Sequence, residues 1–266
     1  MPRIRPVSGR LGGSRLLELT PFFFAVSVPA VLFAGISKGG FGSGAAFASS
    51  AILALVLPPG QALGVMLPLL MLIDAATLGP FWKRWSVPDA KLLILGGLPG
   101  VALGALLYQI AEPDVFRVLI GAIALGFIAW QLAVQYKVFQ APAERLPGWV
   151  GLIAGATAGF TSFVSHAGGP PAAAYMLSQR LDKTTYQATT VLVFWAINIA
   201  KFVPYVLLGL FTATSLTANL ILAPVALIGT WIGVKAHHRM NERLFFGITY
   251  VALGVTGVKL VWEGLT

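Results

Sequence analysis

Two glycine-rich stretches decide the fold: GISKGGFGSGAAF at residues 35–47 and GFTSFVSHAGGPPA at residues 159–172. Each lies between two apolar segments, and clusters of glycine and proline are typical of places where a helix is interrupted. Because the two stretches resemble each other, we expect broken helices at equivalent places in two similar halves of the chain.

The composition places these helices in a lipid bilayer. Hydrophobic residues make up 57% of the chain and charged residues only 10%, which is more apolar than a soluble domain of this length tolerates. The sequence therefore predicts an all-α polytopic membrane protein whose partner is the lipid bilayer.

The charge and the rare residue types exclude several classes of function. We interpret the net charge of +9 as topology information and predict no nucleic-acid partner, because no basic stripe is interleaved with aromatic residues. The chain has no cysteine, so disulfides, thiolate catalysis and cysteine-based metal sites are excluded. Histidine and acidic residues are few, so we expect no metal and no other cofactor, and because no Ser/His/Asp set or pair of acids lies inside the apolar segments we expect no enzyme and no catalytic residue. There is also no phosphate-binding loop motif that would indicate nucleotide-driven transport.

Ten apolar segments are expected, five in each half. Residues 1–18 are predicted to form a flexible basic tail, 19–136 the first membrane repeat, 137–148 a connector and 149–266 the second membrane repeat. The segments run over Leu16–Ser37, Ala45–Leu57, Gln61–Phe81, Pro88–Ile110 and Val115–Gln135, and over Trp149–Val164, Pro170–Leu177, Thr185–Leu210, Leu216–Val234 and Leu244–Val261. The second segment of each half is shorter than the ~20 residues that a span needs. We therefore predict 8–10 membrane helices and leave open whether the short segments span or re-enter.

An odd number of segments in each repeat predicts that the two repeats enter the membrane in opposite directions. Basic loop residues such as Lys83, Arg84 and Lys235 follow odd-numbered segments. The positive-inside rule then places the odd-numbered ends in the cytoplasm and both termini outside. The four arginines of the N-terminal tail contradict this orientation, so the side of the N-terminus stays open.

The two breaks predict a binding site for an anion. A half-helix is expected to begin near Ser43 in the first break and at Gly169, followed by Pro170, in the second. Free backbone N–H groups and the positive end of the helix dipole would then face the break. The predicted substrate-binding residues here are Gly42, Ser43, Gly44, Ser165, His166, Gly168 and Gly169. The alternative is that the glycines only permit close helix crossing.

Ionisable residues inside the predicted spans complete the candidate set, because each is costly in lipid and usually serves a function. Lys38, Lys201 and its neighbour Asn198 are predicted to bind substrate, and His166 or Asp74 to carry a coupling proton. Alignment of the repeats on Gln61 and Gln187 puts Asp74 within one residue of the counterpart of Lys201, so these two could pair. The alternatives are snorkelling to the headgroups for Lys38, a structural ion pair for Asp74 with Lys201 and a packing role for His166.

The breaks, the duplication and the length together resemble the sulfite exporter TauE/SafE family of bacterial membrane permeases. The resemblance covers residues from about Phe22 to Trp262, and its anchors are GGFGSGAAF in one half and HAGGPPA in the other. Ala45 and Ala46 stand where a further glycine is typical of the family, which predicts a less close approach of that backbone to the ligand. The resemblance implies transport of sulfite or an organosulfur anion such as a sulfonate in the bacterial inner membrane.

The sequence therefore predicts a secondary transporter that moves a small anion by alternating access, with proton coupling as an option. A small-anion channel is the first alternative, and an intramembrane enzyme or a scaffold is a weaker one. The substrate, the direction of transport and a homodimeric assembly are left open.

Overall fold

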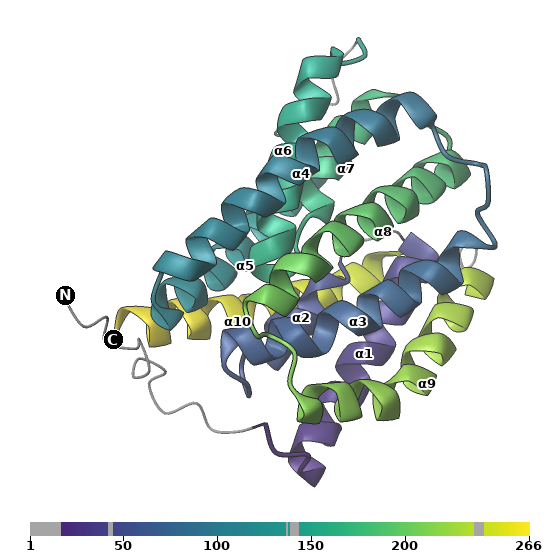
Figure 1. The fold of residues 1–266 in the computed structure, drawn as a ribbon. Coiled ribbons are helices and arrows are strands. Elements are labelled where there is room, and N and C mark those ends of the chain that lie inside the picture. The colour runs from purple at the N-terminus through teal and green to yellow at the C-terminus, as the bar shows by residue number, and fades with distance from the viewer. Residues whose placement is uncertain (1–16, 42–44, 137, 139–143, 237–241) are drawn as a thin grey trace, which may run out of the picture.

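The computed structural model describes residues 17–41, 45–136, 138, 144–236 and 242–266, and it contains ten helices and no strand in these ranges (Figure 1). The first half contains α1 (Pro21–Phe41), α2 (Phe47–Leu53), α3 (Pro59–Leu78), α4 (Val87–Ile110) and α5 (Pro113–Gln135). The second half contains α6 (Gly148–Ser165), α7 (Gly169–Ser178), α8 (Lys183–Leu207), α9 (Ala213–Ala236) and α10 (Glu242–Leu265). The predicted all-α membrane fold is confirmed, whereas the repeat itself stays a prediction.

Seven helices in the described part of the chain are long and apolar enough to cross a bilayer: α1, α3, α4, α5, α6, α8 and α9. The 24 residues of α10 also exceed the ~20 that a crossing needs. In contrast, α2 has seven residues and α7 has ten, so neither can cross alone.

Each short helix returns the chain to the end of the molecule from which the helix before it started. The side-chain amide of Gln179, which follows α7, donates to the backbone carbonyl of Leu146, just before α6, over 3.1 Å. At the opposite end, one cavity is lined both by residues at the start of α1 and by residues that follow α2. The pairs α1–α2 and α6–α7 are therefore helical hairpins. Because the ten residues of α7 rise only about 15 Å at ~1.5 Å per residue, the second break lies near half the depth of a ~30 Å hydrocarbon core.

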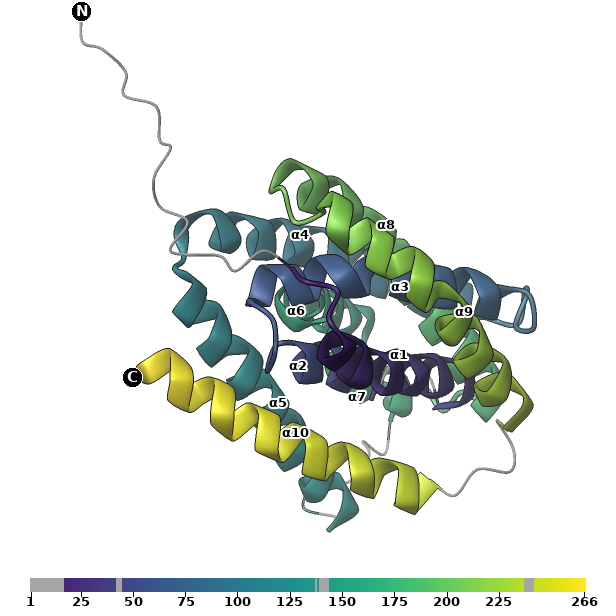
Figure 2. The same ribbon diagram turned by 90° about the horizontal axis from the view of Figure 1, so that it is seen from below.

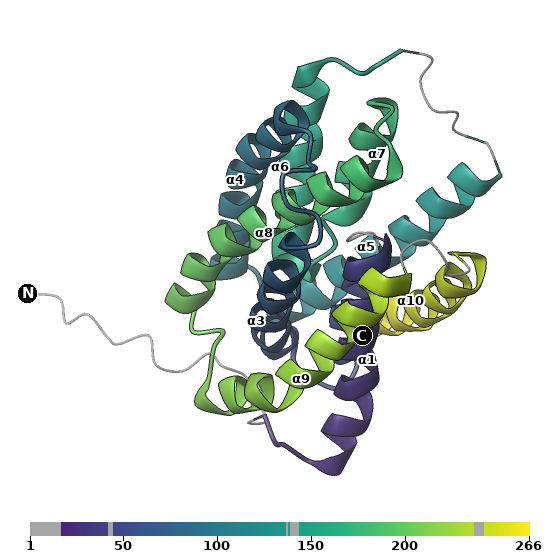
Figure 3. The same cartoon turned by 90° about the vertical axis from the view of Figure 1, so that its right-hand side faces the viewer.

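The two hairpins lie between two groups of helices. Figure 2 shows α3, α4, α8 and α9 on one side of the hairpins and the α5–α10 pair on the other. Within this arrangement α4 packs along α6, and α9 packs along α1 (Figure 3). Exchange of the two halves would convert one of these contacts into the other, so the pairing supports the predicted repeat.

Glycine makes these two helix crossings possible. A Cβ atom at Gly159 of α6 would lie 2.1 Å from the carbonyl oxygen of Gly97 in α4, and one at Gly229 of α9 would lie 2.5 Å from that of Leu32 in α1. Gly39 and Gly40 also face the backbone of α9. The close-crossing interpretation therefore holds for these two glycines of the first glycine-rich stretch, and α1 continues helically through them to Phe41.

Candidate functional site

The second break is built around the left-handed backbone of His166. The chain leaves α6 at Ser165, and His166 takes φ 59° and ψ 15°. The backbone N–H of His166 donates to the Ser162 carbonyl, and that of Ala167 donates to the Thr161 carbonyl. These two bonds satisfy carbonyls at the end of α6, as in other helix ends that close with a left-handed residue. The break is thus an ordered turn.

The start of α7 was correctly predicted at Gly169, but it offers few backbone donors. A helix leaves its first N–H groups without helical partners, yet Pro170 and Pro171 occupy this first turn and proline has no N–H. Only Gly168 and Gly169 supply N–H groups here. The proposed attraction of an anion to this helix end therefore needs side-chain charge in addition to backbone.

Two further candidates at the second break are buried inside the protein. A Cβ atom at Gly168 would lie within 3.0 Å of Phe194, Ala158 and Ser162, so this glycine faces protein and not lipid. The hydroxyl of Ser165 donates to the Thr161 carbonyl over 3.2 Å, which is the backbone role that was weighed against direct anion contact.

The first break departs from the expectation. Gly42, Ser43 and Gly44 lie outside the described residues, and the half-helix α2 begins at Phe47, not near Ser43. A turn at Ala45 and Ala46 precedes it. Because α2 has only two helical turns, its dipole contributes less than that of a long helix. The two breaks are therefore unequal in the structure.

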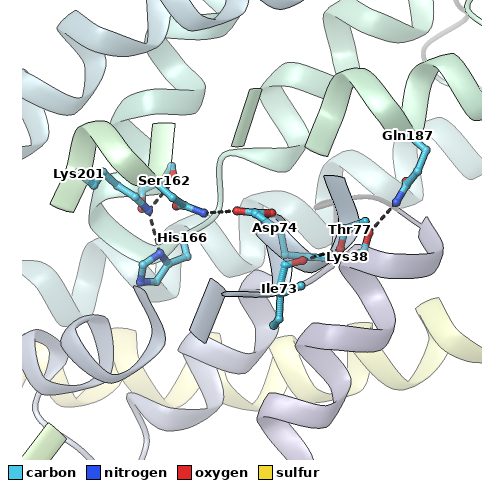
Figure 4. A network of polar contacts seen from close by, with 9 residues as sticks. Lys38, Ile73, Asp74, Thr77, Ser162, His166, Gln187 and Lys201 are labelled. Carbon is cyan, nitrogen blue, oxygen red and sulfur yellow. Dashed lines mark hydrogen bonds and ion pairs between the residues drawn. The ribbon is translucent and has the colours of Figure 1, made fainter. Parts of the chain in front are cut away.

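Lys201 lies at the centre of a buried polar cluster beside the second break (Figure 4). Its side chain is fully buried. Its ammonium nitrogen Nζ lies 3.0 Å from the Ser162 carbonyl oxygen, 2.9 Å from Ser162 Oγ and 2.9 Å from His166 Nδ1. The cluster thus joins α8 to the end of α6.

Asp74 forms a second buried cluster next to the first, and its partner is not the one predicted. The Lys38 ammonium makes an ion pair with Asp74 at 2.5 Å, and the side-chain amide of Asn198 donates to the other carboxylate oxygen over 2.7 Å. The suggested pairing of Asp74 with Lys201 is therefore wrong. Snorkelling is also excluded for Lys38, because only 3% of this residue is exposed.

Two residues that sequence analysis did not assign to the site support these clusters. The side-chain amide of Gln187 in α8 donates to the Lys38 carbonyl over 2.6 Å at the buried end of α1. The hydroxyl of Tyr205, also in α8, donates to the Phe163 carbonyl over 2.8 Å. A polar residue inside a span was the available signal, since buried helix ends need donors for their last carbonyls.

A cavity of about 1020 Å³ opens at the end of the molecule where α1, α3 and α5 begin. Gln61 of α3 lines this cavity. Two residues further along α3, the carbonyl oxygen of Leu63 lies 3.4 Å from His166 Nε2. A second cavity of about 340 Å³ lies among α1, α2 and α10 and has apolar walls. No candidate residue lines either cavity, so both clusters lie outside them.

Comparison with known proteins identifies one similarity. The sequence model of a family described as sulfite exporter TauE/SafE matches residues 27–260, which is most of the chain. No curated protein and no solved structure matches.

Proposed function

Because this chain belongs to the sulfite exporter TauE/SafE family, a family of membrane transporters for sulfite or related anions, we propose that it carries a sulfur-containing anion, either sulfite or a sulfonate, across the bacterial inner membrane by alternating access. The membership and the seven apolar helices make it a multi-pass membrane protein. A transporter family also agrees with the expectation that the chain is not an enzyme.

The observation that carries the proposal is the concentration of buried charge beside the second helix break. Lys38, Asp74, His166 and Lys201 come from α1, α3, the α6–α7 break and α8, and their side chains join in the two neighbouring clusters. Ionisable groups at membrane depth are costly and usually mark a substrate or ion pathway. The excess of lysine over aspartate favours an anion as the ligand.

The arrangement of the two hairpins supports alternating access. The 1020 Å³ cavity opens at one end of the molecule, whereas the α6–α7 hairpin closes on itself at the opposite end through Gln179 and Leu146. A site at a break between pseudo-symmetric halves can become accessible from either side when one half rocks against the other. His166 and Asp74 are the candidates for carrying a proton during this cycle.

Uptake by liposomes that contain the purified protein tests the proposal. Sulfite, thiosulfate and methanesulfonate are offered one at a time, with and without a pH gradient. We expect saturable uptake of at least one of these anions and acceleration by the gradient when uptake is proton-coupled. Lys201→Met should abolish this uptake, and Lys259→Met, on the exposed face of α10, is the matched control that should transport like the unmodified protein.

Two results would contradict the proposal. Movement of cations or neutral solutes without any anion would make the substrate assignment wrong. Electrical recording from a planar bilayer separates a carrier from a channel, because unitary anion currents would far exceed the turnover of a carrier.

A further inference from the structure

The two buried lysines differ in charge balance. Lys38 has a carboxylate partner in Asp74 at 2.5 Å, so this pair sums to zero. Among the described residues, Lys201 Nζ contacts the Ser162 carbonyl, the Ser162 hydroxyl and the His166 ring, and it lies 6.0 Å from the centre of the Tyr205 ring. Among the residues that the structure describes, no carboxylate lies within ion-pair distance of Lys201, and the α8 side chain that donates to Asp74 is Asn198.

The contacts of His166 show that it does not add a second positive charge. A backbone carbonyl can only accept, so His166 Nε2 must carry the proton that faces the Leu63 carbonyl. Only one proton can lie between Lys201 Nζ and His166 Nδ1 at 2.9 Å, so the two side chains together carry at most one positive charge, and with the ammonium as donor the ring is neutral. Tyr205, the other titratable group that lies against Lys201, donates its hydroxyl proton to the Phe163 carbonyl and is neutral as well.

The groups that face this region therefore leave one positive charge without compensation, and it lies on Lys201. An uncompensated charge in a low-dielectric interior is costly, and the cost falls when an opposite charge arrives. We propose that Lys201, and not Lys38, is the counter-ion of the transported anion, and that the site is balanced for one monoanion. This inference rests on the proposed transport of a small anion and specifies the charge of the substrate and the residue that receives it.

The charge of the bound anion then decides its affinity. A monoanion brings the sum of Lys38, Asp74 and Lys201 to zero, whereas a dianion leaves one negative charge uncompensated. Lys38 and Asp74 keep a separate role as a neutral pair that ties the end of α1 to α3. The site should thus select a hydrogensulfite-like or sulfonate monoanion over a sulfate-like dianion.

Binding of two anions of fixed charge to the detergent-solubilised protein tests this selectivity. Methanesulfonate is the monoanion and sulfate the dianion, and calorimetry is performed at one pH above the range in which histidine titrates. We expect a preference for methanesulfonate of about tenfold or more, since leaving a buried charge unpaired is expensive. In the isosteric variant Asp74→Asn, the positive charge of Lys38 is released, and the preference should shift toward sulfate by about the same factor. A ratio measured on one sample does not depend on the fraction of protein that is folded.

Two double variants of equal net charge identify the lysine. Lys38→Met with Asp74→Asn leaves Lys201 as the only charge of the three, and Lys201→Met with Asp74→Asn leaves only Lys38. We expect the first double variant to bind methanesulfonate at least about tenfold more tightly than the second. Equal binding by the two, or an unchanged selectivity in Asp74→Asn, overturns the inference while anion transport itself stands. If the unmodified protein binds neither anion and transports none, the proposed function fails and this inference fails with it.

Discussion

The residue that shapes the second break is His166, and its backbone role can be separated from its side-chain role. Its φ of 59° lies in the left-handed region, where a residue with a Cβ atom is strained and glycine is not. His166→Gly and His166→Ala both remove the imidazole. We therefore expect His166→Gly to be more stable than His166→Ala by about 1 kcal/mol, because the left-handed strain outweighs the greater entropy of glycine in the unfolded chain. Thermal unfolding of the two variants in the same detergent measures the difference, and equal melting temperatures would contradict the assigned backbone role.

The partners of the buried charges were harder to predict than their positions. The sequence identified Lys38, Asp74, Asn198 and Lys201 as polar residues in apolar segments, and the structure brings them into neighbouring clusters. Alignment of two repeats gives equivalent positions along the chain, but it does not give the reach of a side chain. Lys38 extends from the end of α1 to α3 and forms an ion pair with Asp74. Lys201 instead contacts Ser162 and His166 at the turn after α6. Their roles in transport stay predictions.

At the scale of helices, helix-breaking residues determined which helix ends could be predicted from the sequence. The segments expected to end at Ile110 and Gln135 end there in α4 and α5, where a proline or polar residues follow. The end of the first segment was placed at Ser37, four residues too early, because the glycines that follow resemble a break. Gly39 and Gly40 in fact lie against the backbone of α9, so tertiary packing keeps them helical.

The crossing of α4 with α6 depends on a glycine that can be tested directly. A Cβ atom at Gly159 would lie 2.1 Å from the Gly97 carbonyl oxygen, so Gly159→Ala must push two backbones apart. Overpacking of this kind costs about 1–3 kcal/mol. Gly126→Ala on α5 is the matched control, because a Cβ atom there meets nothing within 4 Å. Thermal unfolding in detergent should show a lower melting temperature for Gly159→Ala alone, and a melting temperature like that of the control would rule out the close crossing.

The start of α8 predicts a stability that depends on pH. The Asp182 carboxylate accepts from the Thr185 hydroxyl over 2.6 Å and from the backbone N–H groups of Thr184 and Thr185 over 3.0 Å. The pKa of this carboxyl lies below its ordinary value of 3.8, chiefly because of the hydrogen bond from the Thr185 hydroxyl and then because of the bonds from these N–H groups. A carboxyl with a lowered pKa in the folded state stabilises the fold above its unfolded pKa, and the contribution is lost as the pH falls through the folded pKa.

Asp182→Ala should therefore melt at a lower temperature than the unmodified protein at neutral pH. The gap should close as the pH falls below 3.8. Asp182→Asn is the control, because asparagine caps a helix without an ionisable group. The melting temperature of this variant should not show the loss at acid pH that comes from protonation of the Asp182 carboxylate. A gap between Asp182→Ala and the unmodified protein that persists at the lowest pH would show that the cap acts without its charge.

At the scale of the whole molecule, the contacts divide the loops between two ends. The backbone N–H of Ser86 donates to Thr189, and the Tyr175 hydroxyl donates to Asp89, which joins the α3–α4 loop to the end of α7 and the start of α8. The opposite end holds the cavity and the α8–α9 loop, whose Leu210 lies against Gly64 near the start of α3. The alternation of loops predicted from the basic residues therefore has a structural counterpart, although the contacts do not say which end faces the cytoplasm.

Cysteine labelling of intact cells decides this orientation, and a chain without cysteine is suited to it. Gly79→Cys and Glu144→Cys probe the end that carries the basic loops, and Glu112→Cys and Ala213→Cys probe the cavity end; all four positions are exposed. Since basic residues are retained in the cytoplasm, we expect a membrane-impermeant maleimide to label the second pair at once and the first pair only after permeabilisation. The reversed pattern would mean that the four arginines of the N-terminal tail outweigh the basic loops, so that the cavity opens to the cytoplasm. Similar labelling of both pairs would contradict the assignment of these loops to opposite ends.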